Sequence, residues 1–297
     1  MTTLPPPAND QAFCTVSALE AGHLKLPLEV FLDNATPGSV LPTPSLSFLL
    51  RHSKTGKKLV FDLGIRKDLE NHPPSVQKWI IDTAFDPSVP QDVAESLTLG
   101  GLSPADVDTV CISHCHWDHT GDTKPFTNSE VIFGAASASF FKPGYPEDPN
   151  SPFVSDLLPQ GRTRFVELNE QPPLGPFPHA LDLYSDGSVY IADAPGHIAG
   201  HVVLIARTSP DGGWILLGGD SAHHWNLITG ESKVAVGRPG FPTGCAHLDQ
   251  AAAELNIQRI REFLKLPRTR VILAHDEPWY KENKGGAAFW PGHIASK

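Results

Sequence analysis

The sequence has few of the residues that mark secreted, membrane-spanning or metal-thiolate proteins. Its 297 residues contain only four cysteines, and their spacing matches neither a disulfide framework nor a CxxC zinc site. No run approaches the ~18 consecutive apolar residues of a membrane span. The first residues have neither the basic nor the apolar region of a secretory signal. These absences predict a reducing, cytoplasmic setting and no association with membranes.

Basic residues are scarce as well. Lysine and arginine number 23 against 33 aspartates and glutamates, which gives a net charge of −10 with histidine neutral. An acidic surface repels phosphate backbones, so we expect no nucleic-acid partner. The composition is that of a globular chain, with 40% hydrophobic and 19% charged residues. We expect a flexible N-terminal arm over residues 1–20 and a single domain over residues 21–297.

The pattern of apolar residues predicts alternating strands and helices, hence an α/β or α+β fold built in layers. The best helix spans His247–Lys265, with an apolar stripe of Leu248, Ala252, Leu255, Ile260 and Phe263. Two stretches, 142–161 and 223–244, are rich in proline and glycine and have no periodicity, so we expect loops there. The other expected helices are Val76–Phe85 and Asp92–Leu97, and the expected strands are Ser45–Leu50, Leu59–Leu63, Thr109–Ile112, Glu130–Phe133, Arg164–Leu168, Val189–Ala192, His201–Ala206, Trp214–Leu217 and Val271–Ala274.

Histidine is the one unusually abundant residue, with 14 in the chain, and three of them fall within six residues. The segment His114-Cys115-His116-Trp117-Asp118-His119 has the form HxHxDH. In a chain of this composition, chance alone would produce the pattern about once in several hundred sequences. In an extended segment, positions 114, 116 and 118 point to one side and 119 to another. Ligands that point in two directions suit two adjacent metal ions better than one, and a histidine-rich surface loop is the alternative.

Further metal-competent side chains follow predicted strands elsewhere in the chain. His197 comes shortly after Val189–Ala192, Asp220 after Trp214–Leu217, and His275 directly after Val271–Ala274. Functional sites gather where the carboxyl ends of strands emerge from a sheet. We therefore expect these residues and the HxHxDH segment to meet at one edge.

The succession HxHxDH, PGHIAGH, GGD and a late strand-terminal histidine resembles the metallo-β-lactamase superfamily of hydrolases. The resemblance covers roughly residues 45–275 and implies a four-layer αββα sandwich with metal ions at one edge. It implies that His114, His116 and His197 hold the first ion, that Asp118, His119 and His275 hold the second, and that Asp220 bridges them. His201, four residues after His197, would have a structural role.

The ligand types indicate the chemistry. Imidazole and carboxylate ligands without thiolate suit two Zn²⁺ ions, with manganese or iron as alternatives in the second position. Paired ions supply hydroxide at neutral pH for attack on a carbonyl. Asp118 is the candidate for orienting this nucleophile and moving its proton. A catalytic thiol at Cys115 is a weaker hypothesis, because this side chain would point away from the ligands.

Within the superfamily, the chain resembles the compact lactonases and lactamases, including fungal enzymes that open benzoxazolinones. We therefore predict a hydrolase that opens a cyclic amide or ester in a small molecule. A thioesterase or acyclic-ester hydrolase on the same metal site, and a catalytically silent metal- or partner-binding protein, are the alternatives. The sequence does not fix the oligomeric state.

One position departs from the lactonases that the chain resembles. They have a substrate-binding tyrosine three residues after the bridging aspartate, where this chain has His223. His223 is therefore either a solvated loop residue or a hydrogen-bond donor to the developing oxyanion, and Tyr280 is a candidate replacement for the phenol. The two irregular stretches are expected to form an apolar slot from Phe140, Phe141, Tyr145, Phe153, Trp225, Leu227 and Phe241.

Overall fold

The computed structural model describes residues 3–238, 241 and 243–297, and its largest element is a mixed six-stranded sheet. The first three strands in the sheet order pair antiparallel and the remaining neighbours pair parallel. In order across the sheet, the strands are β1 (Cys14–Leu19), β4 (Ser47–His52), β5 (Lys58–Phe61), β6 (Thr109–Cys111), β7 (Glu130–Gly134) and β8 (Thr163–Val166).

A second sheet of five strands packs against the first. Its strands pair antiparallel except for the parallel pair β12–β13. In order they are β13 (Thr269–Ile272), β12 (Trp214–Leu217), β11 (Val202–Arg207), β10 (Val189–Asp193) and β9 (Ala180–Asp182). A separate hairpin consists of β2 (His23–Pro27) and β3 (Val40–Pro44).

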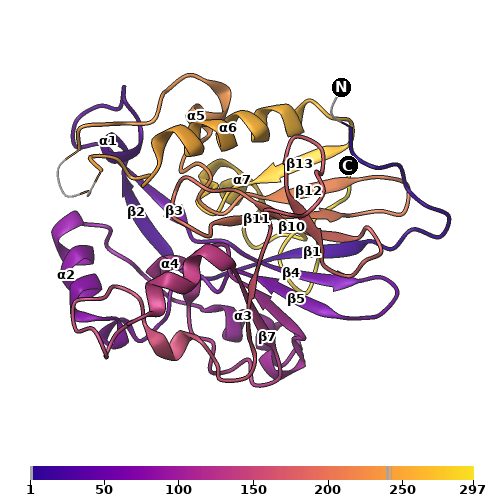
Figure 1. Ribbon diagram of the computed structural model, residues 1–297, viewed down its shortest axis with the longest axis horizontal. Helices are drawn as coiled ribbons and strands as arrows, with labels where there is room; N and C mark the ends of the chain where they lie inside the picture. Colours follow the sequence, from indigo (N-terminus) through magenta and orange to yellow (C-terminus); the bar gives the residue numbers. More distant parts are fainter. Residues whose placement is uncertain (1–2, 239–240, 242) are drawn as a thin grey trace.

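Helices cover the outer faces of both sheets. Figure 1 shows α5 and α6 on the outer side of the second sheet and α3 beside the first. The helices are α1 (Leu28–Phe31), α2 (Pro74–Thr83), α3 (Val93–Leu99), α4 (Trp117–Thr120), α5 (Trp225–Thr229), α6 (Gln250–Leu264) and α7 (Glu277–Asn283).

Alternating side chains of the strands build three hydrophobic cores between these layers. In β4, Phe48 and Leu50 face the core between the two sheets, whereas Leu49 faces the core beneath α3. In β11, Leu204 faces the inter-sheet core and Ile205 faces the core beneath α6. This period-two alternation in both sheets confirms the predicted αββα sandwich.

Two boundaries predicted from the sequence are wrong. Residues 1–20 were expected as a flexible arm, but Cys14–Leu19 form strand β1, which pairs with β4 along its whole length. The alternating apolar side chains Cys14, Val16 and Ala18 are buried in the inter-sheet core, and this burial fixes the segment.

The long helix near the C-terminus is also shorter than predicted. It begins at Gln250, where the side chain of Asp249 accepts a hydrogen bond from the Ala252 amide and caps the first turn. Leu248 and Leu255, assigned to its apolar stripe, are 45% and 47% exposed. Ile260 and Phe263 are buried as predicted, and the rest of the buried face is Ala253, Asn256 and Ile257.

The two stretches expected as loops differ from one another. Stretch 142–161 has one short 3₁₀ turn, Ser155–Leu157, whereas stretch 223–244 contains helix α5 in its described part. In the described ranges, no helix is both long and apolar enough to cross a bilayer. The four cysteines are all buried and free.

Candidate metal centre and active site

The HxHxDH segment is held in a fixed shape at the end of β6. Ser113 donates hydrogen bonds to Asp62 from its backbone N–H (2.6 Å) and its hydroxyl (2.7 Å). His114 and His116 precede helix α4, whereas Asp118 and His119 belong to it. The extended-chain argument grouped Asp118 with His114 and His116, and this was wrong because the segment turns into a helix at Trp117.

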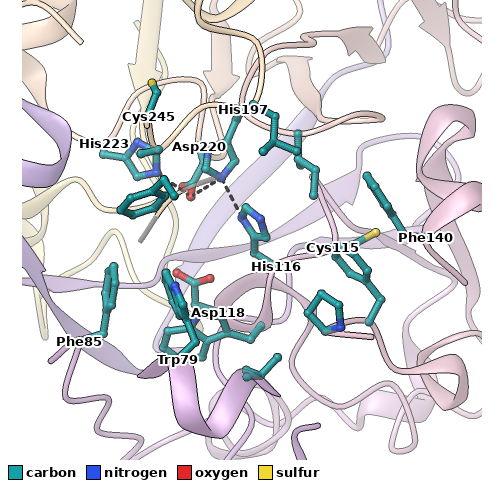
Figure 2. Close-up of a pocket in the computed structure, with 18 of the residues that line it drawn as sticks. Trp79, Phe85, Cys115, His116, Asp118, Phe140, His197, Asp220, His223 and Cys245 are labelled. Carbon is teal, nitrogen blue, oxygen red and sulfur yellow. Dashed lines mark hydrogen bonds and ion pairs between the residues drawn. The ribbon is translucent and has the colours of Figure 1, made fainter. Parts of the chain in front are cut away.

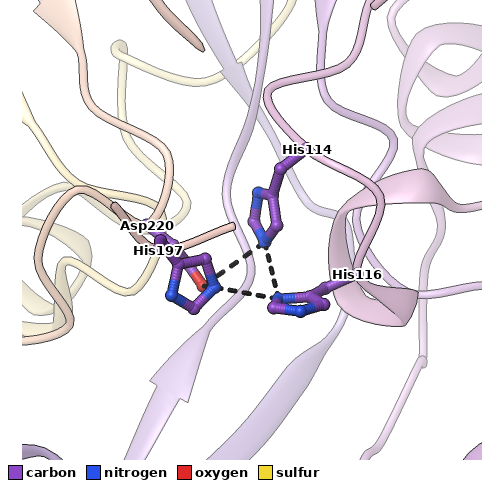
Figure 3. Close-up of side chains that lie close together, drawn as sticks. All are labelled: His114, His116, His197 and Asp220. Carbon is purple, nitrogen blue, oxygen red and sulfur yellow. Dashed lines mark hydrogen bonds and ion pairs between the residues drawn. The ribbon is translucent and has the colours of Figure 1, made fainter. Parts of the chain in front are cut away.

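The first group of candidate ligands joins three histidines and one aspartate (Figure 3). His116 Nδ1 lies 2.8 Å from His197 Nε2 and 3.0 Å from His114 Nε2. Asp220 Oδ2 lies 3.4 Å from His197 Nε2 and 3.8 Å from His114 Nε2. Three ring nitrogens and one carboxylate oxygen thus converge on one point, which suits a tetrahedral zinc site.

The second group joins Asp118, His119, His275 and, again, Asp220. Asp220 Oδ1 lies 3.3 Å from both His119 Nε2 and His275 Nε2. Asp118 Oδ2 lies 3.5 Å from His275 Nε2 and 3.8 Å from His119 Nε2. Asp220 therefore faces the two groups with different oxygens, which is the arrangement expected of a bridging carboxylate.

The electrostatics of the first group favour metal binding. Burial lowers the pKa values of His114 and His197 well below the ordinary value, and it lowers that of His116 to about 4. Neighbouring histidines lower the first two further. These imidazoles are therefore neutral at pH 7, and only a neutral imidazole nitrogen can bind a metal.

The second group is strongly anionic and attracts positive charge. Burial acts to lower the pKa of His119, but Asp220 and Asp118 outweigh it and raise this pKa well above its usual range. His119 Nε2 and Asp220 Oδ1 are buried without a hydrogen-bond partner in the described part of the chain. A cation between these atoms would satisfy both, so the residues fit a second metal ion.

In several candidate ligands, the ring nitrogen that does not face the proposed metal position is hydrogen-bonded to a protein group. His119 Nδ1 is 3.0 Å from Asp62 Oδ2, and His275 Nδ1 donates to the Pro44 carbonyl at 2.9 Å. His201 Nε2 accepts from the Asp220 N–H at 3.0 Å, so it holds the backbone of the candidate bridge, as its predicted structural role requires. Such partners set the tautomer and orientation of the ring that binds the metal.

Two further residues near the candidate ligands, Asp62 and His247, are not predicted by the motifs in the sequence. Asp62 follows the apolar strand β5 directly, and the rule applied to the other strand ends would have found it. His247 was placed only at the start of a helix. In the structure it is buried beside His197 and His223, with ring centroids 5.2 Å from each.

His223 is buried, not solvated. Its Nε2 lies 3.1 Å from Asp220 Oδ2, and its ring stacks on Phe31 with centroids 4.2 Å apart. Tyr280 does not replace the missing phenol, because its hydroxyl donates to Glu20 at 2.9 Å and it does not line the pocket.

A cavity of about 470 Å³ opens over both groups of candidate ligands. Of the predicted slot residues, Phe140, Phe153 and Phe241 line it, whereas Phe141, Tyr145, Trp225 and Leu227 do not. Figure 2 shows Trp79 and Phe85 on one side of His116 and Phe140 on the other. Trp79 stacks on Phe85 with centroids 4.8 Å apart, and Phe140 stacks on Phe153 at 4.5 Å. The wall formed by Trp79 and Phe85 is not among the features predicted from the sequence.

A family model of the metallo-beta-lactamase superfamily matches residues 40–275. The chain belongs to this superfamily. It is 35% identical over 210 residues to the gamma-lactamase FDB1 of Fusarium pseudograminearum, covering 67% of this chain and 50% of that protein. It is 26% identical over 277 residues to the N-acyl homoserine lactonase AttM of Azorhizobium caulinodans, covering 90% and 96%.

The solved structures confirm the superfamily fold. An N-acyl homoserine lactone hydrolase with N-hexanoyl-L-homoserine bound superposes with a TM-score of 0.70 at 19% identity, covering 96% of this chain and 100% of that one. The chain spans between 36% and 62% of the length of the first curated relatives it matches. The relatives of this superfamily member include named lactamases and lactonases, and its His/Asp clusters fit divalent metal.

Proposed function

We propose that this chain is a binuclear metal hydrolase that opens a cyclic amide or ester bond of a small, uncharged molecule. His114, His116 and His197 would hold one ion, and Asp118, His119 and His275 the other, with Asp220 shared. The observation that carries the proposal is the placement of Asp220, whose two oxygens face two separate sets of imidazole nitrogens beneath one cavity. Zinc suits this donor set, and manganese or iron would fit the second position.

Bound metal would supply a water of lowered pKa and a Lewis acid for the substrate carbonyl. Asp118 lines the cavity and is the carboxylate placed to receive the proton of the attacking water. It would then pass this proton to the leaving amide nitrogen or ring oxygen as the cyclic bond breaks. The products are a carboxylate and a free amine or hydroxyl on the same molecule.

His223 lies beside Asp220, the residue that would bridge the two ions. Its Nε2 faces Asp220 Oδ2, which favours a role in orienting that carboxylate. Donation from His223 to the developing oxyanion remains a prediction, and it would require this N–H to turn away from Asp220.

The walls of the cavity limit the substrate. Among the described residues that line it, none is a lysine or arginine, and aromatic side chains dominate beyond the candidate ligands. A charged group on the substrate body would therefore be buried without a partner, which is costly. A neutral, flat or acyl-bearing lactam or lactone fits the lining, and its volume lies in the range of small-molecule sites.

A matched panel of substrates tests the proposal. Metal-loaded protein is assayed with a lactam, a lactone, a thioester and an acyclic ester that share one uncharged body, and with a lactone that carries an added carboxylate. We expect turnover of the neutral cyclic compounds and little turnover of the carboxylated one. Preference for the thioester or acyclic ester would favour the alternative hydrolase, and inertness to all would favour the catalytically silent alternative.

Trp79 offers a test of the aromatic wall. Replacing it by alanine removes a stacked face from the cavity, which is worth about 1–2 kcal/mol to an apolar ligand. We expect Trp79→Ala to raise KM about tenfold for the neutral substrate with little change in kcat. Leu99→Ala, at an exposed position on α3, is the control. An unchanged KM would remove Trp79 from substrate binding.

A further inference from the structure

Three histidines form a third cluster next to the first group of candidate ligands. His197, His223 and His247 each contribute one ring nitrogen to a set whose members all lie within 4.8 Å of one another. All three side chains are at least 95% buried. The rings of His197 and His223 have centroids 4.9 Å apart, and each is 5.2 Å from His247.

These rings have hydrogen-bonding capacity that the rest of the site does not use. The Nδ1 atoms of all three are buried and find no partner in the described ranges of the chain. When Nε2 of His197 binds the first ion, Nδ1 carries the proton of the neutral ring. When Nε2 of a neutral His223, 3.1 Å from Asp220 Oδ2, carries the proton of that ring, its Nδ1 is an acceptor. A buried donor and a buried acceptor therefore lie on neighbouring rings, and both need a partner.

The backbone holds His247 against the loop of His197. The Leu248 N–H donates to the His197 carbonyl at 3.0 Å, and the Asp249 N–H donates to the Gly196 carbonyl at 2.9 Å. Gly196 has φ +132°, and a Cβ there would lie 2.3 Å from the Ala253 nitrogen of α6. Only glycine permits this approach, so the start of α6 and the ligand loop are joined where His247 lies.

The spacing of the three rings is compatible with one small bridging group. Three atoms no more than 4.8 Å apart all lie within about 2.8 Å of a common point, which is within hydrogen-bond reach of a single water. A water molecule at such a point would have three polar partners, as buried waters usually do.

We propose that His247 is a positioning residue that completes the hydrogen bonding of His197 and His223 through one buried water. By this contact it fixes the tautomer and orientation of His197, and it supports Asp220 through His223. The inference rests on the proposed metal site, and His247 itself touches neither metal nor substrate. Partners of metal-binding histidines typically contribute 10–100-fold to metal affinity.

The test compares His247→Leu with His247→Gln, which keeps a donor and an acceptor. Zinc affinity at both positions is measured by chelator competition, with His293→Leu at an exposed position as the matched control. We expect leucine to weaken one of the two ions about 10–100-fold, and glutamine to recover most of that loss. The other ion should remain within about threefold of the unmodified protein.

The outcomes separate this inference from the proposed function. Unmodified protein that binds no zinc would refute the metal site itself. Two ions bound with unchanged affinity in His247→Leu, or equal losses with leucine and glutamine, would overturn only the role of His247. A third zinc per chain would also overturn it, because the cluster would then be a metal site.

If the His247→Leu variant does not fold, the proposal is still testable by a measurement on the unmodified protein. In zinc-loaded protein with ¹⁵N-labelled histidine, we expect the His197 Nδ1–H to be slow to exchange and hydrogen-bonded to nitrogen or bound water. A rapidly exchanging proton at that nitrogen would overturn the proposal.

Discussion

Two buried histidine sites, the cluster of the candidate metal centre and the single residue His52, lie at opposite ends of strand β4 and differ in how their polar atoms are satisfied. At one end, Ser45 donates to the Asp118 carbonyl beside the candidate metal centre. At the other end, His52 Nε2 lies 2.8 Å from Asp186 and 3.1 Å from Ser188, and its Nδ1 accepts from two backbone N–H groups. His52 has a partner for both nitrogens, whereas the candidate metal centre contains buried nitrogen and oxygen atoms that have none in the described part of the chain.

This difference distinguishes a structural histidine from a candidate ligand. Both kinds are buried and both lie near carboxylates, so burial and charge alone do not separate them. A satisfied histidine stabilises the fold, whereas converging atoms without partners indicate that something else must bind them. The following predictions test this distinction, from the largest expected effect to the smallest.

The largest effect is expected at Asp220. Its two oxygens face both groups, so Asp220→Ala removes the shared negative charge and one ligand atom from each group. We expect metal affinity to fall about 100-fold or more at both positions, measured by chelator competition. Loss confined to one ion would contradict a bridging role.

Asp118→Asn should separate chemistry from metal binding. The amide keeps the shape and one ligating oxygen of the side chain but cannot accept the proton of the attacking water. We expect kcat to fall about 10²–10⁴-fold while most of the metal is retained, measured by kinetics and elemental analysis of one sample. Full turnover with full metal occupancy would exclude Asp118 from proton transfer.

The site of His52 should behave in the opposite way. His52→Leu removes the imidazole partner of Asp186, of the Ser188 hydroxyl and of two backbone N–H groups. We expect the free energy of unfolding to fall by about 2–4 kcal/mol in denaturant titrations, with metal content and KM unchanged. A loss of metal in this variant would contradict the distinction between the two sites.

The smallest effect concerns pH. Burial, reinforced by Arg66, lowers the pKa of His72 from 6.5 to about 4. Between these values the unfolded chain binds a proton that the folded chain does not, so this histidine makes stability fall as pH decreases from 6.5 toward 4. The drop in Tm of metal-free protein between pH 7 and pH 5 should be about 2–4 °C smaller in His72→Asn than in the unmodified chain. An equal drop would contradict the assignment.

The sequence predicts a layered α/β or α+β fold and the convergence of candidate ligands because these depend on local patterns, and the four-layer sandwich is implied by the resemblance to the superfamily. Apolar runs mark the strands, and the HxHxDH motif with three strand-terminal residues marks one edge. Their assignment as ligands is still a prediction. The structure adds the geometry, in particular that Asp220 lies between two sets of histidines.

Other features depend on contacts between distant segments and could not be predicted this way. Trp79 comes from α2, far in sequence from the HxHxDH motif, and only packing brings it to the cavity. Leu255 fits an apolar stripe by spacing, yet the helix turns that position toward solvent. His247 has no neighbouring motif, and its position beside His197 results from the approach at Gly196.

The most direct test of the central claim is the metal content of protein that was purified without chelator and reconstituted with zinc. Elemental analysis of the unmodified chain and of His52→Leu should give close to two ions per chain in both. A value below one in the unmodified chain, or anomalous scattering from a crystal that places metal away from Asp220, would contradict the account.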